Sequence, residues 1–492
     1  MKSAKSKNLE GDLAAIVGAE FVSSEPGETA AYGADRSYVP RKNPDAVVRP
    51  QTREQVRAVV RWANRTRTPL VPVSSAPPRF RGDTVPAAGG VVVDLSGMNK
   101  VLRVDRRNRV MVAEAGATFE DLAPLAEAAG LRMVGPLLPK AGKSILASVL
   151  EREPGIAPRY QWDVSDPLCC MEVVFGNGEF FRTGEAAGPG GLEAQWKIGG
   201  AQKFPCGPHQ LDYHRLVQGA QGTMGVATWA SIKCELLPSV SSLFFLCHDE
   251  LAPLVSYAYK AVKRNVGEEL FLANGKALAM MAAADADQAA RFAHGFPSWV
   301  LVHVINGFER LPEERVAYQT ADAADLAQDC GLALKKRVDG LGSASFLKRL
   351  RTPGAKPYWK HAAKGASQEI FFVTTMDRAH QYLPIVFNEA SRAGYPASDI
   401  GVYLQPMVQG SSCHMEFVLP FDPEDERDAE RVREVFFSVS RALLAAGAFF
   451  SRPYPAWAAD VYRARSDAVI PLRRVKSVFD PNGVMNPGKL CF

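Results

Sequence analysis

Apolar and polar residues in the first part of the chain follow strand and helix spacings in alternation. Thr52 and Gln55 match a helix capping box, and Thr118 matches an N-cap for a second helix that Gly130 ends. The alternation of strand and helix patterns along this part of the chain predicts two small α/β units. The expected strands are 47–50, 69–73, 90–95 and 110–115, and the expected helices are 13–19, 52–62 and 118–129.

A glycine-containing turn at 176–178 predicts a β-hairpin over residues 170–183. The Gly/Pro-rich segment 184–207 is expected to be irregular. A β-prone run at 226–233 then predicts a strand, and Pro238 ends this part of the chain.

After Pro238 the pattern changes to a repeated strand–helix set. Asp422 as N-cap, Pro423 at the first helical position and Gly447 past the end mark the last helix of this set. The pattern predicts a separate, lid-like domain with an antiparallel sheet backed by helices. Its expected strands are 243–247, 299–305, 370–374, 402–406 and 414–419, and its expected helices are 251–265, 313–329, 380–393 and 422–446.

A cluster of lysines and arginines occupies residues 342–367. A solvated basic loop is the favoured interpretation, and a site for an acidic substrate or partner is the alternative. The cluster consists of Lys348, Arg349, Arg351, Lys356, Lys360 and Lys364.

Composition narrows the class of protein. The chain has 492 residues, 47% hydrophobic content and a net charge of +5 without a basic arm, which disfavours nucleic-acid binding. No apolar run approaches the roughly 18 residues of a membrane span, and no apolar signal region follows the basic start. The eight cysteines contain no Cys-x-x-Cys pair, so neither a zinc ribbon nor an internal iron–sulfur cluster is expected. A soluble, cytoplasmic protein is predicted.

Three glycines, Gly219, Gly222 and Gly225, stand three residues apart immediately before a predicted strand. Glycines at this spacing allow a tight turn and expose backbone N–H groups to a ligand. The alternative is a plain loop-to-strand turn.

Two motifs in this order resemble those of the FAD-linked oxidoreductases of the vanillyl-alcohol oxidase and para-cresol methylhydroxylase (PCMH) superfamily. They are Gly219-Ala-Gln-Gly-Thr-Met-Gly225 and Phe479-Asp-Pro-Asn-Gly-Val-Met-Asn-Pro-Gly-Lys489, and the hairpin 170–184 also resembles a family segment. The resemblance implies an α+β fold, in which a two-subdomain PCMH-type FAD-binding domain carries an inserted α/β cap domain. We expect the FAD-binding domain at 1–239 (core about 40–239), the cap or substrate domain at 240–460, and the return to the FAD domain at 461–492.

The resemblance implies FAD, expected to be bound non-covalently, with one departure in its phosphate loop. The family's glycine-rich loop is replaced by Ser74-Ser-Ala-Pro-Pro-Arg-Phe-Arg-Gly82, in which Pro77 and Pro78 have no N–H to offer a pyrophosphate. Arg79 and Arg81 are expected to supply charge instead. A second family Gly-Gly is replaced by Leu146-Ala147. The expected FAD contacts are Ser74, Ser75, Arg79, Gly82, Ser144, Ile145, Gly219, Gln221, Gly222, Thr223, Gly225, Val226, Asn486 and Lys489.

Three residues are candidates for catalysis. In the hydroxy-acid branch of the family two histidines help to hold a metal; here His414 is present but Met407 replaces the other, so no metal site is expected. His414 is a candidate base or hydrogen-bond donor, or a structural histidine. The pair Tyr462-Arg463 resembles the pair that binds the phenolate in the phenol-oxidising branch. Four aromatic residues are predicted either to line a pocket or to pack in the core: Tyr358, Tyr403, Tyr454 and Trp457.

Three functions follow from the resemblance. The first is an FAD-dependent dehydrogenase or oxidase that takes a hydride from an aromatic alcohol or an alkylphenol. The second is a 2-hydroxy-acid dehydrogenase of the lactate or glycolate type, and the third is a flavin-depleted subunit of a redox complex. The electron acceptor is left open, with a small-molecule substrate, an acceptor protein or iron–sulfur subunit, and a homo- or hetero-oligomer as the expected partners.

Overall fold

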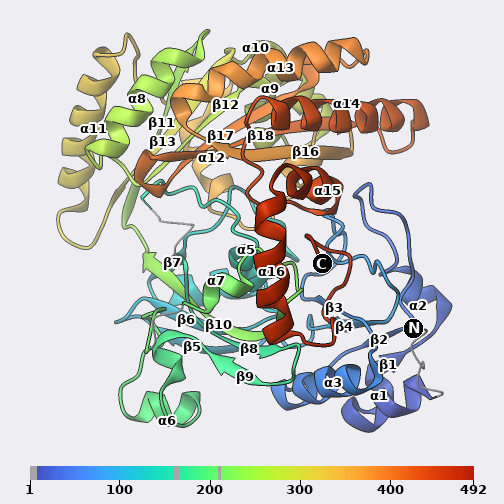
Figure 1. Ribbon diagram of the computed structural model, residues 1–492. Helices are drawn as coiled ribbons and strands as arrows, with labels where there is room; N and C mark the ends of the chain where they lie inside the picture. Colours follow the sequence, from blue (N-terminus) through green and yellow to red (C-terminus); the bar gives the residue numbers. More distant parts are fainter. Residues whose placement is uncertain (1–7, 160–165, 209–211) are drawn as a thin grey trace.

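The computed structural model describes residues 8–159, 166–208 and 212–492, and it places three main sheets in two layers of the molecule (Figure 1). The first sheet has four strands in the order β1-β2-β4-β3, in which β2, β4 and β3 are parallel. Its strands are β1 (Val22–Ser23), β2 (Ala46–Val48), β3 (Leu70–Val73) and β4 (Val91–Asp94).

Helix α3 (Arg53–Thr66) covers the first sheet with an apolar face that includes Val56, Val59 and Val60. The Thr52 side chain accepts a hydrogen bond from the Gln55 backbone N–H at 3.2 Å, as predicted. The Gln55 side chain accepts from the Gln51 N–H and not from Thr52, so the predicted capping box is only half formed.

The second sheet is antiparallel and contains the predicted hairpin, β8 (Leu168–Phe175) with β9 (Phe180–Arg182). Its other strands are β5 (Val101–Asp105), β6 (Val110–Glu114), β7 (Leu131–Met133) and β10 (Gly225–Leu236). The flanking helices are α1 (Leu9–Val17) and α2 (Pro26–Ala30) on the first unit, and α4 (Phe119–Ala128), α5 (Ile145–Leu150), α6 (Leu192–Lys197) and α7 (His214–Val217) on the second. The first residue of β10 is Gly225. Glycine is required there because an added Cβ would lie 2.4 Å from the Val174 carbonyl oxygen of the neighbouring strand.

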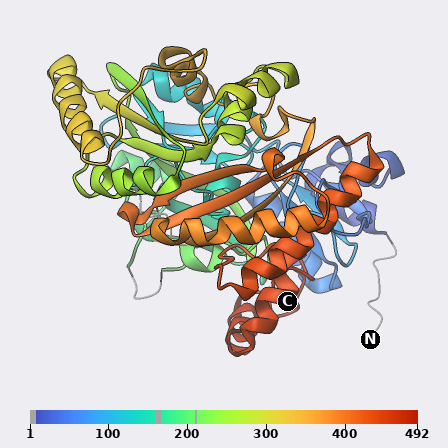
Figure 2. The ribbon, with the colours of Figure 1, turned by 90° about the horizontal axis from the view of Figure 1, so that it is seen from above.

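The third sheet is antiparallel, has six strands, and is buried on both faces (Figure 2). Leu270 and Leu272 of β12 pack on one face, and Phe271 and Ala273 pack on the other. In order across the sheet, the strands are β11 (Val240–His248), β13 (Trp299–Gly307), β12 (Glu269–Asn274), β17 (Gly401–Met407), β18 (Ser412–Phe421) and β16 (Ala366–Thr374).

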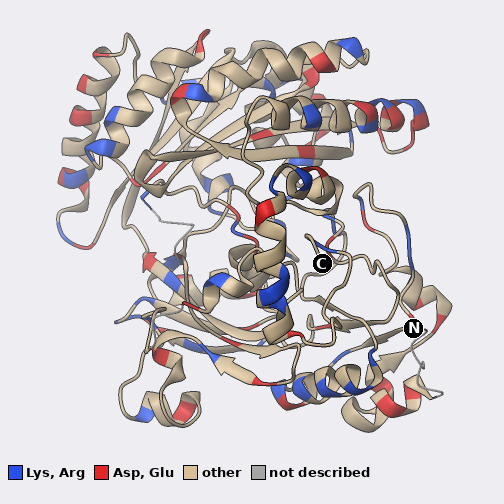
Figure 3. Cartoon of the chain, viewed as in Figure 1, with Lys and Arg blue, Asp and Glu red and all other residues tan. Residues whose placement is uncertain are grey.

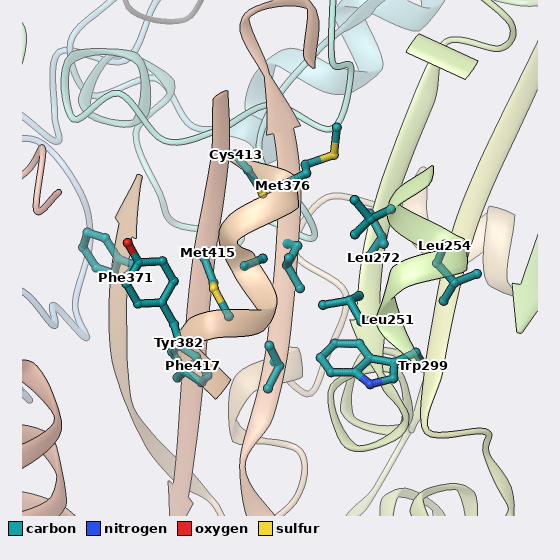
Figure 4. Packing of buried hydrophobic residues seen from close by; sticks show 14 of the residues in the cluster. Leu251, Leu254, Leu272, Trp299, Phe371, Met376, Tyr382, Cys413, Met415 and Phe417 are labelled. Atoms are coloured by element: carbon teal, nitrogen blue, oxygen red, sulfur yellow. The ribbon is translucent and has the colours of Figure 1, made fainter. Parts of the chain in front are cut away.

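Helices cover both faces of the third sheet. The larger core (Figure 4) packs Leu251, Leu254, Met376 and Tyr382 against the strands. Its helices are α8 (Leu251–Lys263), α11 (Pro312–Gln328), α13 (Ala379–Arg392) and α14 (Glu426–Ala445). The opposite core is built with α9 (Gly275–Ala282), α10 (Ala286–Gly295) and α12 (Ser343–Leu350).

The chain returns from the third sheet to the first through α15 (Pro455–Ala464) and α16 (Ser466–Phe479), which runs down the front of the molecule in Figure 1. The tail then lies beside β3: the Leu70 N–H donates to the Val484 carbonyl at 2.8 Å, and the Asn486 N–H donates to the Leu70 carbonyl at 2.8 Å. A buried carboxylate, Asp480, accepts from the Val484 and Met485 N–H groups and fixes this turn.

Several sequence-based expectations were wrong in detail. Helix α14 begins at Glu426 because the Asp425 carboxylate accepts from the first helical N–H groups, whereas Asp422 belongs to the preceding turn. The segment 342–367 is not a solvated loop, because it contains α12 and the buried, ion-paired Lys360. Strand β12 and helices α9 and α10 were not predicted, and α6 lies in the segment expected to be irregular.

Positive and negative side chains are interspersed over both layers (Figure 3), as the composition indicates. None of the helices in residues 8–159, 166–208 and 212–492 is long and apolar enough to cross a membrane. All eight cysteines lie in these ranges and are free thiols; four of them are buried.

A buried histidine in the third sheet makes the stability of the protein pH-dependent. His303 Nδ1 lies 2.7 Å from the Tyr257 hydroxyl and its Nε2 lies 2.9 Å from the Val266 carbonyl oxygen, and burial lowers the pKa of His303 to about 4. Because the folded pKa is below the unfolded value of about 6.5, stability is complete above pH 6.5 and is lost as the pH falls towards 4, by about 3 kcal/mol from this group.

We therefore expect the free energy of unfolding to fall between pH 6.5 and 4, and His303→Gln to flatten this fall by about 1.4 kcal/mol per pH unit. Urea unfolding at several pH values measures the slope. Burial also lowers the pKa values of His361 and His414 to about 4, so the variant should keep part of the slope. An unchanged slope in the variant would contradict the assignment.

Candidate functional site

One cavity of about 630 Å³ lies where the three sheets meet. Its lower wall comes from the end of β3, the segment 139–154 and the glycine turn before β10, and its upper wall comes from the third sheet and the segment 354–361. A cavity of this size, formed between domains, is typical of cofactor and small-molecule sites.

The loop after β3 forms part of the lower wall and departs from a backbone phosphate cradle. Pro77 and Pro78 lie on the wall, and the Gly82 N–H is already bonded to the Asp35 carboxylate at 2.6 Å. The tail braces this loop from behind: Lys489 Nζ donates to the Gly82 carbonyl at 2.7 Å, and Asn486 Nδ2 donates to the Asp83 carbonyl at 2.8 Å. The loop is therefore held in place, but it offers few free backbone donors.

The glycine turn lies beside this loop. Gln221 and Gly222 both have positive φ, of 52° and 72°, and an added Cβ at Gly222 would lie 2.5 Å from Cγ of Pro72. Asn486 Nδ2 also donates to the Gln221 carbonyl at 2.7 Å, which joins the turn to the tail. Glycine at 222 is thus required by both the backbone conformation and the close approach of β3.

The cavity is lined by more cations than carboxylates. The cations are Arg79, Arg81, Lys140, Lys143, Lys356, Lys360 and Arg452, and the carboxylates are Asp83, Glu151, Glu153 and Glu416. Burial and the nearby Glu151 raise the pKa of Asp83 to about 7, which reduces its negative charge near neutral pH. The balance favours an anionic ligand.

A histidine and an arginine lie together on the upper wall. His414 Nε2 lies 3.2 Å from Glu416 Oε2, and Arg452 Nη2 donates towards His414 Nδ1 at 3.4 Å. The neutral ring therefore carries its proton on Nε2 and presents Nδ1 as an acceptor. Glu416 is held in turn by Lys360 at 2.5 Å.

Burial lowers the pKa of His414 to about 4, although the Glu416 carboxylate acts in the opposite direction. His414 is consequently neutral at physiological pH and able to accept a proton. Arg452 is 7% exposed, and no carboxylate of the described residues lies within 4 Å of its guanidinium group. Phe371 lies beneath that guanidinium group, 4.2 Å from ring centroid to Cζ.

The structure brings about half of the predicted contact residues to the cavity. Ser74, Ser75, Arg79, Gly219, Gln221, Gly222, Gly225 and His414 line it. Gly82, Ser144, Ile145, Thr223, Val226, Asn486 and Lys489 do not; several of them brace the wall through hydrogen bonds, such as that from the Ser144 N–H to Ser75 Oγ at 3.1 Å.

Tyr462 and Arg463 are not brought to the cavity. Arg463 is an exposed residue of α15 that pairs with Asp460 at 3.3 Å, and Tyr462 is only partly buried. Of the four candidate aromatic residues, Tyr358, Tyr403 and Tyr454 line the cavity, whereas Trp457 packs in the core against Phe436. No group of three or more His, Cys, Asp or Glu side chains able to hold a metal ion occurs among the residues that the structure describes.

Sequence reasoning missed Arg452, Lys140 and Glu416. Glu416 had a signal, because a residue two positions after His414 on a strand points to the same face. Arg452 and Lys140 lie in irregular segments, and only the folded chain shows that they reach the cavity.

Comparisons with known proteins agree with the fold and with an FAD-binding domain. Residues 44–184 match the family described as FAD binding domain, and residues 461–490 match the family described as FAD linked oxidases, C-terminal domain. The glycolate oxidase subunit GlcD of Bacillus subtilis is 25% identical over 50% of this chain and 48% of its own length. A D-2-hydroxyglutarate dehydrogenase of Stutzerimonas stutzeri is 25% identical over 97% of this chain and 98% of its own length.

The match to the glycolate oxidase subunit spans about half of that protein. Among solved structures, substrate-bound p-cresol methylhydroxylase has a TM-score of 0.82 at 17% identity and covers 100% of this chain and 98% of its own, so the two share a fold. The cavity contains the glycine turn and abuts the C-terminal tail that carried the resemblance in the sequence. Two segments of this chain thus match families of FAD-binding and FAD-linked oxidase domains, and the whole chain has the fold of p-cresol methylhydroxylase.

Proposed function

We propose that the protein is an FAD-dependent oxidoreductase that takes a hydride from a carbon next to a hydroxyl group or para to a phenol. One observation carries this proposal: Arg452, a buried guanidinium group with no carboxylate within 4 Å among the described residues, lies against a neutral histidine whose other nitrogen faces a carboxylate. When the Arg452 N–H that faces His414 Nδ1 turns to a substrate oxyanion, Nδ1 is freed to accept the substrate's proton.

The residues of the cavity fit FAD. The wall has an excess of cations for the pyrophosphate. Two buried polar atoms of lining residues, Thr84 Oγ1 and Gln221 Oε1, have no hydrogen-bond partner among the residues that the structure describes. Arg79, Ser74 and the glycine turn would hold the cofactor on the lower wall, with side-chain charge in place of the donors lost at Pro77 and Pro78. The cofactor supplies hydride acceptance when bound.

The chain's own residues supply positioning and proton handling. Glu416 orients His414, and Lys360 neutralises Glu416. Aromatic side chains on the upper wall exclude water from the site and favour a flat substrate. We therefore favour an aromatic alcohol or alkylphenol as the substrate.

A 2-hydroxy acid is the second candidate, because Arg452 also suits a carboxylate and two of the relatives are named for glycolate and D-2-hydroxyglutarate. Anaerobic titration separates the candidates. We expect 4-alkylphenols or aromatic alcohols to bleach the flavin band; bleaching by D-lactate or glycolate alone would overturn the preference. An acceptor protein or iron–sulfur subunit, an oligomeric state and a cytoplasmic location remain predictions.

The pH dependence of the rate of flavin reduction on the acidic side of neutrality (its acid limb) tests the role of His414. Because only neutral His414 accepts a proton, we expect the rate to be constant near neutral pH and to fall below it with a midpoint near pH 4. Glu416→Gln removes the carboxylate that raises this pKa, so the limb should move to lower pH. Single-turnover pH-jump measurements finish before acid unfolding interferes, and an identical limb in the variant would exclude His414 as the proton acceptor.

A further inference from the structure

Lys140 is a cation of the cavity wall that has no carboxylate within 4 Å among the residues that the structure describes. Its Nζ lies over two aromatic rings instead, 2.9 Å from the ring centroid of Phe80 and 4.7 Å from that of Tyr358. Burial lowers the pKa of Lys140 well below its usual range, although the Glu369 carboxylate, which lies beyond ion-pair distance, acts in the opposite direction. The neighbouring cations, Arg81 foremost, add to the lowering. An anion beside this ammonium group would offset that cost.

The neighbouring cations contrast with Lys140 because each has a carboxylate of its own. Arg81 contacts Glu369 at 2.7 Å, and Lys143 contacts Glu151 at 2.7 Å. Lys360 contacts both Glu369 and Glu416, at 3.4 Å and 2.5 Å. The paired cations are therefore already satisfied, and Lys140 is left to meet a ligand.

Other groups around Lys140 also lack partners. His361 Nε2 and Trp359 Nε1 are buried and accept or donate no hydrogen bond within the described structure, and both residues line the cavity. The His361 ring lies 5.3 Å from that of Phe80 and 5.1 Å from that of Tyr358. Buried polar atoms without partners are uncommon and indicate a ligand or water in the functional state.

We propose that Lys140 binds an anionic group of the substrate, a carboxylate or a phosphate, at the end of the cavity away from the reacting carbon. The inference rests on the proposed function in taking this cavity as the substrate site. Aromatic rings connect the two ends: the Trp359 and Tyr403 rings lie 6.4 Å apart, and the Tyr403 and His414 rings lie 5.9 Å apart. The substrate class is thus an aromatic compound with an oxidisable carbon at one end and an anionic group at the other.

Anaerobic calorimetric titration of the protein loaded with reduced FAD tests the proposal without turnover, because reduced flavin accepts no hydride from any of the probes. The probes are benzoate, phenyl phosphate and the neutral benzyl alcohol. Benzoate or phenyl phosphate should bind at least about tenfold more tightly than benzyl alcohol, since hydrogen bonds to charged groups are the strong ones. The tighter of the two anions identifies the anionic group of the substrate.

Three variants assign the effect. Lys140→Met should weaken the binding of the anions at least about tenfold, leaving only the share that Arg452 supplies. Lys140→Arg should retain the anion affinity within about threefold because the charge stays. Lys356→Met removes an exposed cation of the same cavity and should change the affinities by less than about twofold, because exposed charges are screened.

Anion binding by Lys140→Met that equals the wild type would overturn the proposal, as would a wild-type protein that binds benzoate and phenyl phosphate no better than benzyl alcohol. The two proposals fail separately. Lys140-dependent anion binding in a protein whose flavin no alcohol, phenol or hydroxy acid reduces would leave the anion site and remove the proposed reaction. Conversely, a protein whose flavin is reduced by substrate but whose anion binding does not depend on Lys140 would leave the proposed reaction and remove the anion site.

Discussion

Arg452→Met is expected to reduce the rate of flavin reduction by substrate by about 10²–10³-fold while the protein keeps its FAD. Arg452 is buried, donates towards His414 Nδ1, and has no carboxylate within 4 Å in the described part of the chain, so its charge is available to an oxyanion. Methionine keeps much of the side-chain volume above Phe371 but removes every donor. Stopped-flow spectroscopy under anaerobic conditions measures the rate.

Arg463→Ala is the matched control for this prediction, because it removes the arginine that the sequence alone marked as the binder of a phenolate. Arg463 is exposed on α15 and pairs with Asp460. We expect its removal to leave flavin reduction within about twofold of the wild type. A large loss in Arg463→Ala together with a normal rate in Arg452→Met would show that the reacting end of the cavity has been assigned to the wrong arginine.

Gly222→Val is expected to give a protein that purifies with little or no flavin. The backbone at Gly222 has a φ of 72°, and a Cβ there would lie 2.5 Å from Cγ of Pro72, at the end of β3 on the cavity wall. Overpacking costs about 1–3 kcal/mol and the left-handed conformation about 1–2 kcal/mol. Since the turn must move to relieve both, we expect FAD affinity to fall at least about tenfold.

Gly331→Val is the control variant, because it introduces the strain of a left-handed backbone without a steric clash. Gly331 also has a positive φ, of 69°, but an added Cβ would meet no atom within 4 Å. This variant should lose some stability and keep its flavin. The ratio of flavin to protein absorbance after gel filtration gives the result for both variants, and a fully flavin-loaded Gly222→Val protein would refute the role of the turn.

The lower wall of the site was predictable from the sequence because its constraints are local. Gly222 is fixed by a turn and a close contact, and the tail signature around Asp480 is fixed by hydrogen bonds within a few residues. Such constraints leave residue types at fixed spacings. The replacement of the glycine-rich phosphate loop by Pro77-Pro78 was visible in the same way.

The cap was harder to predict because its sheet is buried on both faces. Strand β12 has no polar alternation, since Phe271 and Leu272 are both buried on opposite faces, so the strand lacks the period of two that marks a half-exposed strand. Lys360 looked solvated for another reason: its closer ion-pair partner, Glu416 at 2.5 Å, comes from β18 and is distant in sequence.

The central claim is that the cavity between the sheets binds FAD and that a substrate held at Arg452 reduces it. The most direct measurement is anaerobic titration of the purified, yellow protein with 4-alkylphenols and aromatic alcohols, followed at the flavin absorbance band. We predict bleaching in proportion to the substrate added, and bleaching that is about 10²–10³-fold slower in Arg452→Met. A colourless protein that takes up no added FAD, or a flavin that no alcohol, phenol or hydroxy acid reduces, would contradict the account.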